Sequence, residues 1–133
     1  MKKNLFSVTL TMLCTLAMLL AGTVKMQAQT PAEWKAMKGN VTMYMTNDMG
    51  RNGYYDQKPI AELMGHMGET LGPKCVLAVG DIHHFNGVAS VNDPLWTTNY
   101  EQVYSHPELM LNWFPVLGNH EYRGNTQAVL DYG

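Results

Sequence analysis

The sequence predicts an α/β domain with a mainly parallel sheet, in the order strand, helix, strand, helix, strand, helix. Two observations lead to this prediction. Strand-like apolar runs alternate with segments in which apolar residues recur at helical spacing. Loops rich in glycine and asparagine separate the two kinds of segment. At 133 residues, the chain is long enough for one domain with a modest core.

Residues 1–28 are predicted to form a secretory signal peptide. Lys2 and Lys3 precede a nearly uncharged apolar stretch from Leu5 to Ala21, and small residues follow in GTVKMQAQT. Hydroxyl side chains dilute the apolar stretch, which favours a cleaved signal over the alternative, an N-terminal membrane anchor. We therefore expect an exported protein, periplasmic or extracellular, with no stable membrane association after cleavage.

The first strand and helix are predicted after a polar linker at residues 29–40. The segment VTMYMT at 41–46 alternates apolar and polar residues and predicts a strand. Asp56 is a candidate helix cap, and Gly72 with Pro73 supplies a stop signal. Between them, apolar residues fall at helical spacing at Ile60, Leu63, Met64, Met67 and Leu71. These signals predict an amphipathic helix.

The pattern then repeats twice. The continuous apolar run KCVLAVG is typical of a strand covered on both faces, and we expect Cys75 within it to be a small buried residue. A helical segment is predicted from Trp96 to Tyr104, with a short piece after Pro107. NWFPVLG predicts a third buried strand, and Asn125 is expected to cap a last helix.

Composition excludes several classes of protein. The net charge of −2 and the absence of basic runs argue against a nucleic-acid partner. Only one cysteine, Cys75, follows the predicted leader, so no intrachain disulfide is expected. No G-x-G-x-x-G sequence follows a strand, which argues against a dinucleotide-binding domain.

Polar side chains follow all three predicted strands. They are Asn47 and Asp48, then Asp81, His83 and His84, then Asn119 and His120. Taken singly, an Asp after a strand is more often a helix cap or an Asx turn. However, the carboxyl ends of parallel strands meet at one edge of the sheet, where ligands bind. Carboxylate, amide and imidazole donors together suit Zn, Mn or Fe, and a metal would relieve the repulsion between two carboxylates.

Three blocks of sequence resemble a known family. TNDMG, LAVGDIHHFNGV and FPVLGNHEY are similar to the first three blocks of the calcineurin-like metallophosphoesterases, and specifically to purple acid phosphatases of the small, tartrate-resistant type. The resemblance runs from residue 41 to 133. It implies half of a four-layer α/β/β/α sandwich and a phosphate monoester substrate. It also implies two metal ions, Fe with Zn, Mn or Fe, with metal-bound hydroxide as the nucleophile.

The resemblance also implies roles for individual residues. Asp48 would bind the first metal and Asp81 would bridge the two ions. Asn119 would bind the second metal and face the phosphate. His120 would lie beside the leaving group as an acid or hydrogen-bond donor.

Neighbouring residues would support this centre. Gly80 and Gly118 would let the backbone turn sharply, so that the ligands project over the sheet edge. Glu121 would orient His120 or a ligand, although a solvated acid is an equally good interpretation of this residue from sequence.

One histidine, His84, departs from the family pattern, and His83 precedes it in the sequence. His84 occupies the place of the tyrosine ligand that gives the family its colour, and we expect it to bind metal without the charge-transfer band. His83 is expected to face the pocket mouth or solvent.

The family's later histidine blocks have no counterpart, because no histidine follows His120. His66 and His106 are interpreted as helix-face and turn residues. Residues 41–133 are therefore expected to be the N-terminal portion of a truncated metallophosphoesterase domain, which a C-terminal half could complement. The alternative is a catalytically silent fragment or degenerate paralogue that acts as a weak metal-binding or protein-interaction module.

Overall fold

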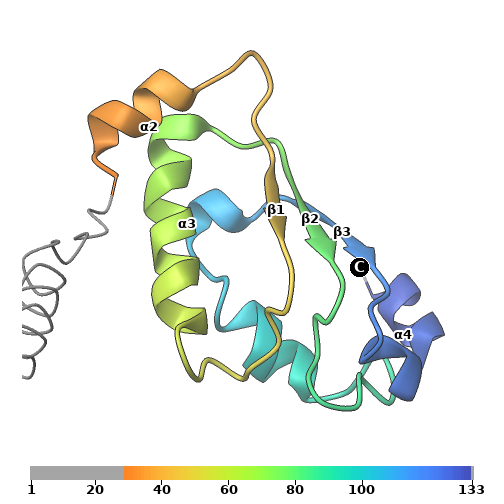
Figure 1. Cartoon of the computed structure of the whole chain (residues 1–133). Coiled ribbons are helices and arrows are strands. Elements are labelled where there is room, and N and C mark those ends of the chain that lie inside the picture. Colours follow the sequence, from red (N-terminus) through yellow and green to blue (C-terminus); the bar gives the residue numbers. More distant parts are fainter. Residues whose placement is uncertain (1–28, 133) are drawn as a thin grey trace, which may run out of the picture.

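A computed structural model of the chain describes residues 29–132, and the predicted signal peptide lies outside them. The strands are β1 (Tyr44–Thr46), β2 (Cys75–Val79) and β3 (Asn112–Val116). They form one parallel sheet in the order β1-β2-β3 (Figure 1). The predicted parallel sheet is confirmed, although β1 begins at Tyr44 rather than at Val41.

The first crossover contains the predicted amphipathic helix, α3 (Gln57–Leu71). Asp56 occupies the N-cap position, but its side chain makes no capping hydrogen bond. At the other end, Gly72 adopts a left-handed conformation with φ 59°, and its N–H donates to the Gly68 carbonyl. Gly72 therefore ends the helix as predicted.

A short helix, α2 (Pro31–Met37), lies in the segment expected to be a polar linker or a short first turn. The Thr30 side chain accepts from the Glu33 N–H, while the Glu33 carboxylate accepts from the Thr30 N–H at 2.6 Å. This capping box explains why a helix begins at that point. All side chains of α2 remain at least partly exposed, and the helix contacts α3.

The second crossover differs from the expected regular helix. It contains a π-helix, η1 (Trp96–Glu101), and a 3₁₀ helix, η2 (Pro107–Leu109). The Gln102 N–H donates to the Thr97 carbonyl, five residues earlier, which is the bond of a π-turn. This winding buries both Trp96 and Asn99, an apolar and a polar side chain.

After β3 the chain forms a 3₁₀ turn, η3 (Glu121–Arg123), and then α4 (Thr126–Asp131). The Asn125 side chain accepts from the Ala128 N–H at 3.2 Å, so the predicted cap is confirmed. The termini of the described part lie on opposite sides of the sheet (Figure 1).

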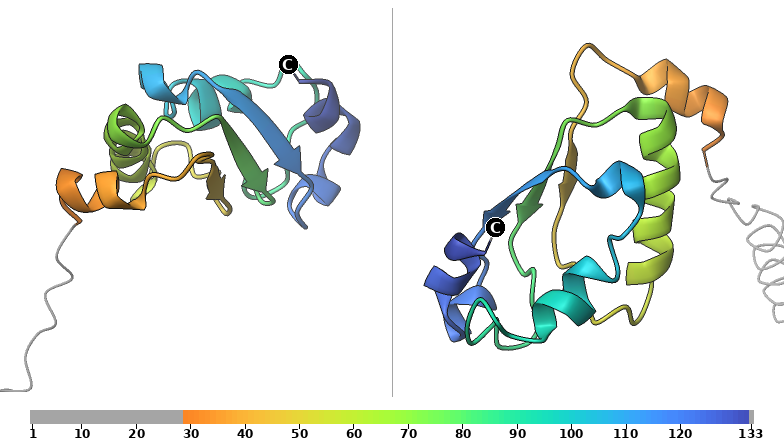
Figure 2. Two further views of the ribbon diagram at one scale, coloured as in Figure 1. Left: turned by 90° about the horizontal axis from the view of Figure 1, so that it is seen from above. Right: turned by 180° about the vertical axis from the view of Figure 1, so that it is seen from behind.

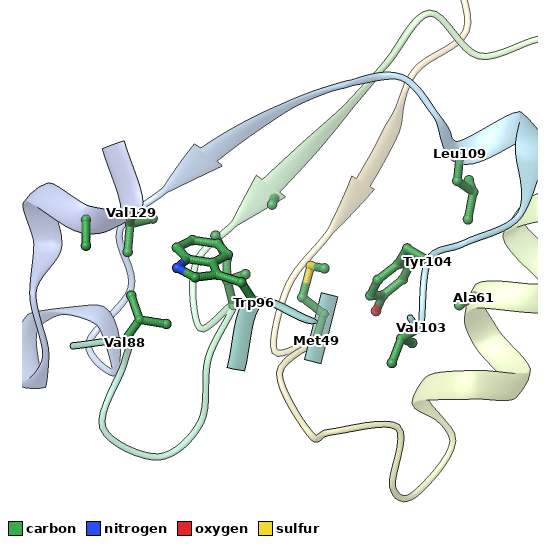
Figure 3. Packing of buried hydrophobic residues seen from close by; sticks show 11 residues of the cluster. Met49, Ala61, Val88, Trp96, Val103, Tyr104, Leu109 and Val129 are labelled. Carbon is green, nitrogen blue, oxygen red and sulfur yellow. The ribbon is translucent and has the colours of Figure 1, made fainter. Parts of the chain in front are cut away.

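The core lies against one face of the sheet. Figure 2 shows α3 beside β1 and α4 beyond β3, with η1 and η2 between them. Figure 3 shows how Trp96, Tyr104 and Met49 fill the middle of this layer. The buried apolar cluster consists of Met49, Ala61, Ala78, Ile82, Val88, Trp96, Val103, Tyr104, Leu109, Ala128 and Val129.

The other face of the sheet carries apolar side chains that no described element covers. The parallel register aligns Met45, Leu77 and Phe114 across the three strands, and pairs Val79 with Val116. Met45 is 73% exposed and Phe114 is 51% exposed. We call these five residues the open face. Within residues 29–132, only one face of the sheet is covered, although the apolar pattern of these strands is typical of strands covered on both faces.

No helix in the described range, residues 29–132, has both the length and the hydropathy needed to cross a bilayer.

Candidate metal centre

Polar side chains from three loops meet at the carboxyl ends of the strands. Asp48 follows β1, Asp81 and His84 follow β2, and His120 follows β3. The Asp48 N–H donates to the Gly80 carbonyl at 3.2 Å, and the His84 N–H donates to the Gly50 carbonyl at 3.2 Å. These bonds hold the first two loops together. Because the strands are parallel, the predicted side chains all lie at one edge of the sheet.

Asp81, His84 and His120 form a cluster of potential ligand atoms. One ligand atom from each lies within 4.8 Å of the others. His120 Nε2 is 3.9 Å from Asp81 Oδ2, and the His84 and His120 rings are 4.1 Å apart between centroids. These separations are longer than hydrogen bonds, and they leave room for a cation between the donors.

Asp48 and Asn119 lie at the more exposed rim of this cluster. Asp48 Oδ1 is 3.6 Å from His84 Nε2, and the Asp48 side chain is 58% exposed. Asn119 is exposed between Gly118 and His120, both of which contact Asp81. The structure therefore joins Asp48 to the cluster through His84 and places Asn119 on the loop beside it.

Both aspartates that follow strands adopt left-handed backbone conformations. Asp48 has φ 51° and Asp81 has φ 52°. This region is unfavourable for residues with a side chain, although Asp and Asn tolerate it best. Such conformations cost about 1–3 kcal/mol and concentrate at functional sites. Here they turn each carboxylate over the edge of the sheet immediately after its strand ends.

Glycines allow the ends of β2 and β3 to approach each other. Gly80 has φ 98°, and a Cβ on it would lie 3.1 Å from the Gly118 Cα. A Cβ on Gly118 would overlap the Asp81 carboxylate and backbone. Gly80 therefore supplies the sharp turn, whereas Gly118 is needed for close approach to Asp81.

Glu121 is fully buried and binds backbone amides. Its Oε2 accepts from the Asp81 N–H and the Gly118 N–H, each at 2.8 Å. Its Oε1 accepts from the His83 N–H at 3.0 Å. The interpretation of Glu121 as a solvated acid is therefore wrong. Glu121 fixes the loops after β2 and β3, and thereby orients Asp81.

The prediction for His83 is also wrong, because this side chain is fully buried. The Asn99 amide lies 2.9 Å from His83 Nδ1, and the His83 ring packs edge-to-face on Trp96 with centroids 4.4 Å apart. Burial lowers the pKa of His83 from its usual 6.5 to about 4, although Glu121 and Asp93 act in the opposite direction. His83 is therefore a neutral structural residue beneath the cluster.

Two buried amides hold the loop after β1. Asn99 Oδ1 accepts from the Asn52 N–H at 2.6 Å, and Asn99 Nδ2 also donates to the Ile82 carbonyl at 3.1 Å. Gln57 Oε1 accepts from the N–H groups of Arg51 and Gly53 at 3.1 and 2.6 Å. No sequence signal marked either amide, because each works through backbone groups far along the chain.

Each clustered histidine turns its Nε2 toward a carboxylate: His84 toward Asp48 and His120 toward Asp81. Burial lowers the pKa of His84 below its usual value, and the charges of Arg51 and His120 lower it further, against the opposite effects of Asp81 and Asp48. A neutral imidazole has a free lone pair for a metal. The Phe85 carbonyl, which can only accept, lies 2.6 Å from His120 Nδ1. The His120 proton is thus on Nδ1, and Nε2 faces Asp81.

An open hollow of about 400 Å³ borders the rim at Asp48. Arg51, Tyr54 and Tyr55 line it, together with Gln57. The Arg51 guanidinium lies 5.3 Å from the Phe85 ring centroid and 5.8 Å from that of Tyr55. A cation therefore stands next to the cluster, where it can attract an anionic ligand.

Known proteins share this sequence and fold. No protein-family model matches the chain. Purple acid phosphatase 7 of Arabidopsis thaliana is 40% identical over 96 residues, which are 72% of this chain and 29% of that protein. Purple acid phosphatase 4 of the same plant is 34% identical over 125 residues, 93% of this chain and 37% of that protein. The chain is a relative of the purple acid phosphatases.

Two more distant proteins agree with this relationship. Tartrate-resistant acid phosphatase type 5 of Homo sapiens is 34% identical over 65 residues, 48% of this chain and 20% of that protein. Among solved structures, GAP50, the anchor in the inner membrane complex of Plasmodium, has a TM-score of 0.61 and 26% identity over 68% of this chain and 29% of that chain. The resemblance to calcineurin-like metallophosphoesterases, and within them to purple acid phosphatases, is confirmed.

The purple acid phosphatase relatives are much longer than the matched region. This chain spans 29% and 37% of the length of the two Arabidopsis proteins. The match to purple acid phosphatase 4 covers 93% of this chain, so it spans the three loops that carry Asp48, Asp81 and His120.

Proposed function

We propose that this chain supplies part of the active site of a metal-dependent phosphomonoester hydrolase of the acid phosphatase type. One observation carries the proposal: ligand atoms of Asp81, His84 and His120 lie within 4.8 Å of one another at the carboxyl edge of the sheet. The sequence blocks that carry these residues resemble those of purple acid phosphatases.

The proposed ligands are Asp48, Asp81 as the bridge, His84 and Asn119, for two ions that combine Fe with Zn, Mn or Fe. The donor set fits, because it offers carboxylate oxygens and a buried neutral imidazole. When bound, such a pair of ions supplies Lewis acidity and an activated water, the hydroxide nucleophile of this proposal.

His120 is proposed to handle the proton of the leaving group. Its Nδ1–H is held by the Phe85 carbonyl, which fixes the ring orientation. Its Nε2 faces the open side of Asp81, and in the protonated ring this atom can donate to the departing alcohol oxygen. Arg51 is proposed to attract the anionic ester toward the same edge.

A second half of the protein is proposed to cover the open face. Met45, Phe114 and Val116 are each more than half exposed, a feature that favours a second packed layer, as in a four-layer sandwich. Further metal ligands would come from that half. Export remains a proposal from residues 1–28, with the protein in the periplasm or outside the cell.

Asp81→Asn tests the proposal. In the complete enzyme, with its second half present, we expect the variant to lose hydrolysis of an aryl phosphate such as para-nitrophenyl phosphate at least 100-fold. It should also bind Zn²⁺ more weakly by equilibrium dialysis, because a neutral amide is a poor bridge between two cations. Asp131→Asn, an exposed change on α4, is the matched control.

Near-normal turnover in Asp81→Asn would contradict the bridging role. A different result would be a parent protein that binds metal through Asp81 but hydrolyses no phosphate monoester. That result would support the alternative, a catalytically silent metal-binding module.

A further inference from the structure

A second group of metal-ligating side chains lies away from the candidate metal centre. His66 and Glu69 lie one turn apart on α3, and His106 immediately precedes η2. The end of α3 leads into the amino end of β2, and η2 leads into the amino end of β3. The proposed phosphatase centre lies at the carboxyl ends, so the group His66–Glu69–His106 is a separate feature of the fold.

The distances in this group match those between ligands of one tetrahedral metal. Glu69 Oε1 lies 3.5 Å from His66 Nδ1 and 3.6 Å from His106 Nε2. One ligand atom from each residue lies within 4.8 Å of the others. Bonds of 2.0–2.2 Å to a tetrahedral Zn²⁺ place ligand atoms about 3.3–3.6 Å apart. Direct hydrogen bonds would be shorter, so the donors are spaced for an intervening ion.

The backbone of α3 is shaped to receive the His106 ring. Gly65 is buried in the middle of the helix, and a Cβ on it would overlap the ring of His106. Glycine is unfavourable inside a helix, so a packing reason is expected. Because Gly65 has no side chain, His106, the residue before η2, can pack against the helix turn that carries His66 and Glu69.

The three donors also differ in exposure in a way that suits a surface metal site. The His106 side chain is 16% exposed and packs against Gly65, whereas His66 and Glu69 are 59% and 58% exposed. One ligand is therefore fixed, while two can adjust to an incoming ion, and the fourth position is open to water.

We propose that His66, Glu69 and His106 form a second metal site, which binds one divalent transition-metal ion of the zinc class and links α3 to η2. Two imidazoles and one carboxylate are a recognised ligand set for Zn²⁺ with a water in the fourth position. The site does not depend on the proposed phosphatase function, because it shares no residue with the candidate metal centre.

Metal binding changes the tautomer of His106. The Glu108 N–H donates to His106 Nδ1 at 3.2 Å, so the neutral ring carries its proton on Nε2. Coordination through Nε2 moves that proton to Nδ1 and releases the exposed Glu108 amide to water. The Glu108 amide is thus a reporter of the site.

The test counts Zn²⁺ bound per chain by equilibrium dialysis and follows the ring nitrogens by NMR in the full chain. Glu69→Gln and His66→Ala alter exposed residues, so both should fold. We expect each variant to bind about one equivalent of Zn²⁺ fewer than the parent, because its affinity for Zn²⁺ at the His66–Glu69–His106 site falls at least tenfold. Glu62→Gln, the same change at an exposed position of the same helix, should bind like the parent.

In the parent, Zn²⁺ should shift the ring-nitrogen signals of His66 and His106 and the amide signal of Glu108. Equal stoichiometry and affinity in all variants, or ring signals that Zn²⁺ leaves unmoved, would overturn the proposal. Asp81→Asn should leave these signals responsive, which separates failure of this site from failure of the phosphatase centre.

Discussion

The candidate metal centre has two groups of polar residues. They differ in how many of their side-chain atoms are already hydrogen-bonded to the backbone. The inner group consists of Gln57, His83, Asn99 and Glu121, and none of its side chains is more than 6% exposed. The outer group consists of Asp48, Asp81, His84 and His120. In the inner group, the carboxylate and amide oxygens accept from backbone N–H groups at 2.6–3.1 Å.

In the outer group, side-chain atoms from different loops face one another at distances longer than a hydrogen bond. Asp48 Oδ1 lies 3.6 Å from His84 Nε2, and Asp81 Oδ2 lies 3.9 Å from His120 Nε2. The inner carboxylate and amide oxygens are satisfied, which adds rigidity, although His83 Nε2 has no hydrogen-bond partner. In the outer group, a cation or a proton can bridge the facing atoms. The inner group therefore holds the loops of the site in place, and the outer group keeps atoms available for a ligand.

Loss of the Glu121 charge should produce the largest effect on stability. In Glu121→Gln, the amide NH₂ must face at least one of three backbone N–H donors, which then loses a charged acceptor in a dry interior. We expect the free energy of unfolding to fall by roughly 3–5 kcal/mol, measured by urea denaturation.

Glu62→Gln is the matched control for this change and should alter the free energy of unfolding by less than about 0.5 kcal/mol. A Glu121→Gln protein as stable as the parent would show that the inner group does not support the loops.

The buried His83 should make stability depend on pH. Its pKa is about 4 in the folded protein, because of burial, against a usual value of 6.5. Between these pH values, His83 binds a proton in the unfolded chain but not in the folded protein. The free energy of unfolding therefore falls as the pH decreases from 6.5, and the loss is complete below pH 4. The expected loss is roughly 3 kcal/mol.

Urea denaturation from pH 7 to pH 4, in the parent and in His83→Phe, measures this contribution. The variant should be less stable at pH 7, since the Asn99 amide loses an acceptor, but its free energy of unfolding should change less with pH. Identical pH profiles would contradict a neutral buried His83.

The fold was predictable where local pattern and tertiary structure agree. Apolar runs marked the strands, and Gly72 and Asn125 marked helix ends through local backbone bonds. The second crossover was not predictable in detail, because its π-helix depends on burying Trp96 in the core and Asn99 beneath remote loops. Those contacts leave no periodic pattern in the sequence.

The same distinction applies to the candidate centre. Asp48, Asp81, His84 and His120 were identifiable because motif residues at the ends of parallel strands converge at one edge. Sequence could not place His83 or decide the role of Glu121, because their burial depends on which backbone amides the neighbouring loops present to them. Asn99 and Gln57 were missed for this reason.

Asp48→Asn should weaken metal binding while having the smallest effect on stability of the three substitutions. Asparagine tolerates the left-handed conformation at φ 51° as aspartate does, and the side chain is 58% exposed, so the free energy of unfolding should change by less than about 0.5 kcal/mol. Binding of Zn²⁺ at the candidate centre should nevertheless weaken about tenfold, because an anionic ligand is replaced by a neutral one. Calorimetric titration with Zn²⁺, beside urea denaturation, measures both quantities. The opposite result would be a loss of stability as large as in Glu121→Gln, with unchanged metal affinity. Asp48 would then support the structure rather than bind metal, and the distinction between the inner and outer groups would be wrong for Asp48.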